Sequence, residues 1–242
     1  MTKDNFSSQA ELYANFRPHY PEDLYQFIFN QTSSFNTAWD CGTGNGQVAK
    51  VLSEVFNKVY ATDISKEQLK QAYPKENIAY SIGSAEASGL TSQVDLITVA
   101  QAIHWFDIKK FVSEAKRVSR NGALLCYWGY GLIQVDEEID LIINDFYKNT
   151  INSYWDPERK LIDEHYRSIK LPLKNEQAGY FQYRKCWSLE HFIGYLTSWS
   201  SVQRFININK YNPVEALQGK LESLWKDEYE VTFPIFLKSG NL

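Results

Sequence analysis

The chain is poor in cysteine, and the spacing of its cysteines excludes several classes of protein. Only three occur among its 242 residues, at Cys41, Cys126 and Cys186. They lie far apart and form no C-x-x-C pair, so neither a metal site nor a redox-active dithiol is predicted. We expect reduced, half-buried thiols in a cytoplasmic protein instead of a disulfide framework.

Long apolar runs and an excess of basic residues are also missing. No stretch approaches the length that a transmembrane helix needs, and the polar start, residues 1–8, lacks the apolar segment of a signal peptide. The net charge is -4, which makes the chain a poor candidate for binding phosphate backbones by bulk charge. The sequence therefore predicts neither a membrane nor a nucleic acid as partner.

Internal repeats, low-complexity segments and a Pro/Gly-rich linker are absent as well, so we expect a single domain. Within residues 1–242 we expect N-terminal cap helices over 1–35, a cofactor-binding core over 36–130, and lid helices with the final strands over 131–242. Aromatic residues, in contrast, are plentiful at 15%. They fit either a core rich in Tyr and Trp or an aromatic-lined pocket.

Strand and helix patterns alternate through the first half of the chain. Apolar runs typical of strands occupy residues 37–41, 58–63, 77–83, 94–100 and 122–129. Helical spacing or capping marks residues 8–16, 21–30, 46–56, 65–73 and 108–119. This alternation predicts an α/β fold with a mainly parallel sheet and right-handed crossovers. Beyond residue 130 we expect helices over 135–168, 188–196 and 213–225, and strands over 180–187 and 229–237.

The stretch DCGTGNG, residues 40–46, joins the first strand of this pattern to a helix. Glycines there tolerate positive φ and let the backbone approach a ligand closely, while the following helix offers free N–H groups. Asp63 ends the next strand, where a carboxylate can accept hydrogen bonds from both hydroxyls of a ribose. A cofactor that carries a ribose is predicted, the alternative being a tight turn with a capping aspartate. No Gly-Lys-Ser/Thr follows, which excludes a P-loop.

With these residues in view, the sequence resembles the class I S-adenosylmethionine-dependent methyltransferases. The resemblance is carried by the glycine loop, Asp63 and three further segments, 83–86, 94–107 and 117–125. The flanks 11–28 and 154–160 are similar to the small-molecule branch that contains trans-aconitate methyltransferases. Membership would imply a Rossmann-like, doubly wound sheet of seven mostly parallel strands with an antiparallel last strand, and added helices forming a lid.

The resemblance also implies which residues bind S-adenosylmethionine. Those that border its methionine part are Asp40, Cys41, Gly42, Thr43 and Gly44. Asp63 would hold the ribose hydroxyls and Ile64 would pack on the adenine. The adenine would be flanked by Ala85 and Glu86, the latter a mild departure because an aspartate is common there. The homocysteine segment would run beside Ala100 and Gln101.

Further aromatic and basic residues are candidates for holding the methyl acceptor. His104, just beyond the fourth strand, would act as a general base for a hydroxyl acceptor or would only hold its loop by hydrogen bonding. Arg17 could bind a carboxylate through two parallel hydrogen bonds, and the carboxylate of the cofactor is favoured over that of the acceptor. The alternative is that Arg17 lies on the surface. Tyr13 and Tyr20 are candidates because they lie close to Arg17 in the sequence, and Trp105 could simply wall the pocket. The remaining candidates, which could equally pack the lid, are Trp155, Arg159 and Arg204.

Taken together, the resemblance implies a methyltransferase for a small organic molecule, with O-methylation of a trans-aconitate-like carboxylic acid as one such reaction. A carboxylate acceptor needs no base, whereas a hydroxyl or an amine must lose a proton, so nearby basic groups bear on the acceptor. Two alternatives stay open. One is a non-catalytic module that binds S-adenosylmethionine, and the other is an NAD-dependent oxidoreductase. A monomer or a homodimer is expected.

Overall fold

The computed structural model describes Phe16 and residues 18–242. Its centre is a seven-stranded sheet with the order β3-β2-β1-β4-β5-β7-β6. The strands are β1 (Thr37–Cys41), β2 (Lys58–Asp63), β3 (Ile78–Ile82), β4 (Val94–Ala100), β5 (Ser119–Tyr130), β6 (Lys174–Trp187) and β7 (Tyr229–Asn241). The first five pair in parallel, and β7 runs antiparallel to both β5 and β6. The predicted sheet is confirmed.

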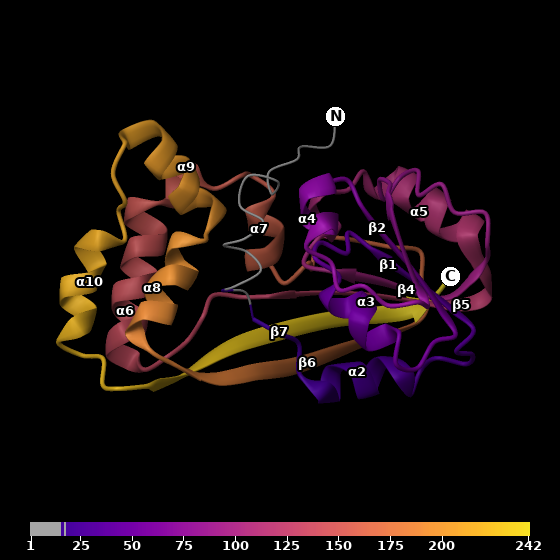
Figure 1. The fold of residues 1–242 in the computed structure, drawn as a ribbon, viewed down its shortest axis with the longest axis horizontal. Helices are drawn as coiled ribbons and strands as arrows, with labels where there is room; N and C mark the ends of the chain where they lie inside the picture. The colour runs from indigo at the N-terminus through magenta and orange to yellow at the C-terminus, as the bar shows by residue number, and fades with distance from the viewer. Residues whose placement is uncertain (1–15, 17) are drawn as a thin grey trace.

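The helices form two groups in Figure 1. Those beside the parallel strands are α2 (Glu22–Phe29), α3 (Gln47–Leu52), α4 (Lys66–Lys70) and α5 (Ile108–Val118). Four others gather at the opposite end of the molecule, namely α6 (Glu137–Asp145), α8 (Leu189–Thr197), α9 (Ser200–Asn209) and α10 (Glu215–Glu222). Between the groups lies α7 (Arg159–Asp163). Single helical turns are η2 (Ile103–Trp105), η3 (Phe146–Thr150) and η4 (Asn152–Tyr154).

The long antiparallel pair of strands β6 and β7 connects the two groups of helices (Figure 1). One end of it continues the sheet beside β5, and the other end reaches the distal helices. There Trp187 packs against Tyr195 of α8, with ring centroids 5.4 Å apart, and against Phe233 of β7 at 5.5 Å. The β6–β7 pair thus fixes the distal helices to the sheet that carries the glycine loop.

Both faces of the parallel sheet are covered, which explains the unbroken apolar runs of its strands. Along β1, Ala38 belongs to the core on one face and Trp39 to the core on the other. Leu96 and Ile97 divide in the same way along β4. A central parallel strand that is buried on both faces needs such a run in place of polar and apolar alternation.

Some boundaries and one element differ from the sequence-based expectation. The helix predicted over 46–56 ends at Leu52, the strand predicted from residue 180 begins at Lys174, and α9 was not predicted at all. The helix expected over 8–16 falls almost wholly outside the described residues. Of the three thiols, Cys41 and Cys126 are buried but Cys186 is exposed, so none is half-buried as expected.

Two kinds of structural feature concern possible partners, namely membrane-spanning helices and metal sites. No helix in this part of the chain has the length and apolar character needed to cross a membrane. Over the same residues, no group of three His, Cys, Asp or Glu side chains is arranged to hold a metal ion.

Candidate functional site

The glycine loop between β1 and α3 takes a left-handed backbone at three positions. The φ angles are 71° at Gly42, 56° at Gly44 and 79° at Gly46. A Cβ atom at Gly42 would lie 2.8 Å from the Cβ of Ala102, so packing also requires glycine there. At Gly44 the nearest atom to such a Cβ is 3.8 Å away. A Cβ at Gly44 would therefore meet only ordinary van der Waals contact, so the left-handed backbone, and not crowding, favours glycine there.

Asp63, at the carboxyl end of β2, holds the glycine loop through its side chain. Its Oδ2 accepts a hydrogen bond from the backbone N–H of Gly44 at 2.8 Å, and its Oδ1 accepts one from the N–H of Ser65 at 2.8 Å. The carboxylate is half-buried, and each oxygen has further acceptor capacity. This is the position that the sequence predicted for binding the hydroxyls of a ribose.

Asp40 is a second carboxylate, buried beneath the loop with 1% of its surface exposed. It accepts hydrogen bonds from the hydroxyls of Thr43 and Thr98. The pKa of Asp40 is raised to about 6, mainly by burial and to a smaller extent by the charge of Asp63, while the hydroxyl hydrogen bonds act in the opposite direction. The side of the loop that is predicted to face the methionine part of a cofactor is therefore acidic.

The residues predicted to surround the adenine follow β2 and β3. Ile64 is half-buried directly after β2, and Ala85 is 6% exposed. The side chain of Glu86 accepts a hydrogen bond from the N–H of Asp107 at 2.9 Å, which joins the loop after β3 to the start of α5. The structure brings all three to the ligand edge of the sheet, and their contact with a cofactor stays a prediction.

Gln101, the residue after β4, has an unusual backbone. Its φ is 52°, a left-handed value that a residue other than glycine adopts at a cost. Its N–H donates to the carbonyl of Trp128 at 2.8 Å, and its Oε1 accepts from the N–H of Tyr130 at 2.9 Å. Strand β5 thereby holds Gln101 and the half-buried Ala100 at the carboxyl end of β4.

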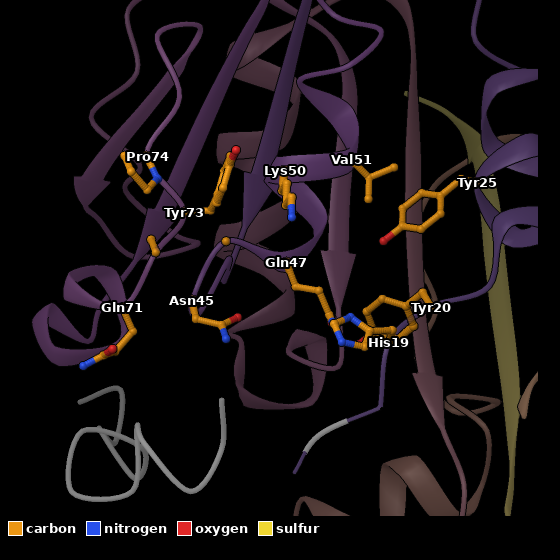
Figure 2. Close-up of a pocket in the computed structure, with 12 residues that line it drawn as sticks. His19, Tyr20, Tyr25, Asn45, Gln47, Lys50, Val51, Gln71, Tyr73 and Pro74 are labelled. Carbon is orange, nitrogen blue, oxygen red and sulfur yellow. The ribbon is translucent and has the colours of Figure 1, made fainter. Parts of the chain in front are cut away.

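A hollow of about 530 Å³ lies beside the glycine loop (Figure 2). Its lining includes residues from the segment before α2, from α3 and from the turn after α4, among them Tyr20, Lys50 and Tyr73. The Nε2 of Gln47 lies 2.6 Å from the Nδ1 of His19 at one side of it. Gly42, Gly44 and Asp63 are not part of the lining, so this hollow adjoins the predicted cofactor position without coinciding with it.

His104 is 6% exposed, and its Nδ1 lies 2.9 Å from the hydroxyl of Tyr166. Burial lowers its pKa to about 3, with a further contribution from the charge of Arg159. The imidazole is therefore neutral at physiological pH and a weak base. This arrangement favours the structural alternative, while a catalytic role stays untested. The ring of Trp105 packs against that of His104 at a tilt of 47°, with ring centroids 4.8 Å apart.

Arg159 at the start of α7 is enclosed by aromatic rings and keeps 15% of its side chain exposed. Its guanidinium carbon lies 4.8 Å from the ring centre of Trp155 and 5.4 Å from that of Tyr147. Its Nε donates to the hydroxyl of Tyr147 at 2.9 Å and lies 3.3 Å from a carboxylate oxygen of Asp163. Among the described residues no hydrogen bond is formed by Nη1 or Nη2.

The other predicted contacts have different surroundings. Arg204 donates to the carboxylate of Asp156 at 2.7 Å and to the carbonyl of Tyr154 at 2.9 Å, which is what packing of the lid requires. Tyr20 packs edge-on against Trp128 at 5.4 Å. Substrate contact by Arg204 or Tyr20 stays a prediction. Tyr13 and Arg17 lie outside the described residues.

The sequence-based reasoning missed three residues of this region. Thr98 binds Asp40, Tyr147 covers Arg159, and the side-chain amide of Gln68 is buried next to the glycine loop. Thr98 lies on β4, opposite Asp40 in the β1–β4 register. Pairing the two predicted strands could therefore have indicated its contact with Asp40. The sequence carries no comparable signal for Tyr147 or Gln68.

The residues at this sheet edge fit a cofactor with a ribose and a positively charged group. Asp63 offers acceptors for hydroxyls, the left-handed glycines let a ligand approach the loop backbone, and Asp40 adds negative charge below. A dinucleotide fingerprint would place its third glycine three residues after the second, whereas here Gly46 follows Gly44 by two.

Comparison with known proteins decides the family. Residues 39–127 match the family described as methyltransferase domain. A Dictyostelium discoideum protein named as a methyltransferase is 34% identical over 245 residues, which cover 97% of this chain and 93% of the relative. The chain belongs to the methyltransferase family.

Solved structures agree with this assignment. A protein named as a type II methyltransferase from Anaeromyxobacter dehalogenans is 33% identical, with a TM-score of 0.85 over 93% of this chain and 98% of that chain. Phosphoethanolamine N-methyltransferase 2 of Haemonchus contortus, solved with S-adenosylhomocysteine, is 15% identical with a TM-score of 0.50, over 95% of this chain and 57% of that one. This second likeness shows the fold alone.

The protein is thus an S-adenosylmethionine-dependent methyltransferase, as the resemblance of its motifs implied. The oxidoreductase and the non-catalytic module, the two alternatives left open by the sequence, are set aside. The resemblance to the trans-aconitate branch, the division of the chain into cap, core and lid, and the individual cofactor contacts stay predictions.

The crowding at Gly42 predicts a loss of stability that a matched glycine does not share. Gly122 also has a positive φ, 79°, but nothing lies within 4 Å of its Cβ direction. We expect Gly122→Ala to cost about 1 kcal/mol from backbone strain alone, and Gly42→Ala to cost at least about 1 kcal/mol more from overpacking. Urea unfolding of both variants without cofactor measures this difference, and equal costs would contradict the close approach to Ala102.

The raised pKa of Asp40 predicts a pH-dependent stability. With a folded pKa of about 6 against an ordinary value of 3.8, the native state binds the proton more tightly than the unfolded state. The contribution of this group to the free energy of unfolding therefore increases as the pH falls through 6, and it is complete below 3.8. Between about pH 7.5 and pH 5 the wild type should gain on the order of 1 kcal/mol relative to Asp40→Asn. If the free energies of unfolding of the two proteins changed equally with pH, Asp40 would have an ordinary pKa.

Proposed function

We propose that the acceptor is a small organic acid and that the enzyme O-methylates a carboxylate of it. The observation that carries this proposal is the half-buried guanidinium of Arg159, which has two nitrogens that form no hydrogen bond to the described residues. The indole Nε1 of Trp155 next to it is buried and likewise has no hydrogen-bond partner in the described part of the chain. A carboxylate would accept hydrogen bonds from such donors, and two parallel N–H groups of an arginine match its two oxygens.

The position of Arg159 supports an acceptor role. Helix α7 packs against η2, the turn that follows β4, and the charge of Arg159 reaches His104 on that turn. In an open α/β sheet the ligand lies at the carboxyl ends of the strands. An acid bound to Arg159 would therefore lie next to the strand end where Ala100 and Gln101 are found.

The surroundings of Arg159 suit an organic molecule. The rings of Tyr147 and Trp155 pack against each other at a tilt, with centroids 5.4 Å apart, and those of Trp155 and Trp199 do the same at 5.8 Å. Such rings cover the carbon skeleton of a ligand while a few polar groups fix its orientation. Arg159 would provide that orientation, and the rings would exclude water from the bound acid.

The neutral state of His104 supports an acceptor that needs no base. Held at the glycine loop and Asp63, S-adenosylmethionine would supply an electrophilic methyl group for a carboxylate oxygen, and its sulfur would retain the electron pair of the C–S bond. No proton has to be removed from an ionised acid. His104, with a pKa of about 3, would keep η2 in place through Tyr166.

We further propose a cytoplasmic enzyme, monomeric or homodimeric, whose acceptor is a free small molecule and not a nucleic acid. The net charge of -4 supports this choice. A trans-aconitate-like tricarboxylate is one acid of the proposed class, since Arg159 suits any carboxylate and the flanking segments resemble that branch.

The test is a methyl-transfer screen of carboxylic acids, tricarboxylates included, against alcohols and amines of matched skeleton. Once an acid is found, Arg159→Met should raise its KM about 10- to 100-fold, the loss expected for charge-assisted hydrogen bonds. The dissociation constant of S-adenosylhomocysteine should stay within about 2-fold of the wild type. Arg184→Met on the exposed face of β6 is the matched control and should change neither value.

Two results would contradict the acid proposal. One is turnover of the alcohols or amines but not of the acids. The other is an unchanged KM for the acid in Arg159→Met. A parallel rise in the dissociation constant of S-adenosylhomocysteine would assign Arg159 to the cofactor and not to the acceptor.

A second prediction concerns His104. His104→Gln keeps a polar group near Tyr166, and kcat with the acid should fall by less than about 10-fold, whereas loss of a general base costs about 10² to 10⁴. The change of the rate between about pH 6 and pH 8 should be the same in the wild type and in His104→Gln, because a group with a pKa of about 3 does not titrate there. A large loss of kcat, together with a titration in this range that the variant lacks, would restore His104 as the base.

A further inference from the structure

The side chain of Gln68 on α4 is buried without a hydrogen-bond partner. Only 3% of the residue is exposed, and neither its Oε1 nor its Nε2 is bonded to protein. The backbone of Gln68 is satisfied, because its N–H donates to the hydroxyl of Ser65 at 3.2 Å. The unsatisfied groups are therefore those of the side-chain amide alone.

The amide is directed at the glycine loop. The closest atom to the Cβ direction of Gly44 is the Oε1 of Gln68, at 3.8 Å. The N–H of the same Gly44 donates to Asp63 at 2.8 Å. Gly44 is thus next to both the Gln68 amide and the carboxylate predicted to bind a ribose. The two ends of the amide can exchange places by a rotation, so either the oxygen or the nitrogen can be presented.

Buried amides without a partner are rare in native proteins, because hydration is lost and nothing replaces it. A bound ligand with complementary groups removes that penalty. A ribose hydroxyl that donates to Asp63 still has lone pairs that can accept a hydrogen bond from an amide N–H. The diol and the amide therefore match in chemistry as well as in position.

We propose that Gln68 is a further cofactor-binding residue, which donates to a ribose hydroxyl held by Asp63. The inference rests on the cofactor of the enzyme and not on the identity of the acceptor, so failure of the acid proposal would leave it intact. A buried amide that serves only a ligand should weaken the free protein and strengthen the complex.

Gln68→Met tests this, because methionine has a similar length without the amide. We expect the melting temperature of the cofactor-free protein to stay unchanged or to rise, since two unsatisfied polar atoms are removed. The dissociation constant of S-adenosylhomocysteine, measured by calorimetry, should rise about 10-fold. The same factor is expected for 5′-methylthioadenosine, which has the ribose but no amino-acid part. Gln71→Met, at an exposed position after the same helix, is the control and should change neither property.

The other outcomes would overturn the proposal. A lower melting temperature without cofactor, whether or not affinity also falls, would show that the amide stabilises the protein itself. An unchanged dissociation constant would show that it does not touch the cofactor. A loss confined to S-adenosylhomocysteine, with 5′-methylthioadenosine unaffected, would place the amide at the amino-acid end and not at the ribose.

Discussion

The carboxylate of Asp63 joins three segments on which the site depends. It ends β2, accepts the N–H of Gly44 in the glycine loop and accepts the N–H of Ser65 at the start of α4. The carbonyl of Thr62 accepts from Gly42 and Thr43 at 2.9 and 3.0 Å, so the end of β2 holds the loop through main chain and side chain alike. A loop with three left-handed residues keeps one conformation only when its surroundings determine it in this way. The acid that is predicted to bind the ribose therefore also shapes the loop that faces it.

The core of this fold could be predicted from sequence because its signals are local. Strand β1, the glycine loop and Asp63 follow one another within a short stretch, and each has a residue type that its backbone requires. The lid gives no such signal. Helix α9 begins after Trp199 without a side-chain cap, and its place depends on contacts such as that between Tyr154 and Phe205. Sequence patterns record neighbours along the chain, whereas these contacts join segments that are far apart in it.

Burial of polar groups was the least predictable property, and it separates residues that look alike in the sequence. Gln68 and Gln71 both lie in a polar stretch, yet one is buried and the other exposed. Arg159 and Arg204 were equivalent candidates, yet Arg204 is paired with Asp156 while Arg159 keeps two nitrogens for another partner. The number of donors that the protein itself satisfies, and not the residue type, decides which side chain can recognise a ligand.

The charges of the two parts of the site are opposite, and this suits the proposed reaction. Asp40 and Asp63 lie at the sheet edge, where a cationic cofactor would bind, while Arg159 lies on α7, where an anionic acceptor would bind. Transfer of a methyl group from a sulfonium to a carboxylate neutralises both charges. A buried environment disfavours the two charged reactants more than the neutral products. The reactants bind there only if opposite charges of the protein hold them. In the proposed reaction, the aromatic rings around Arg159 would keep water away from the acid, and the neutral His104 would add no competing charge.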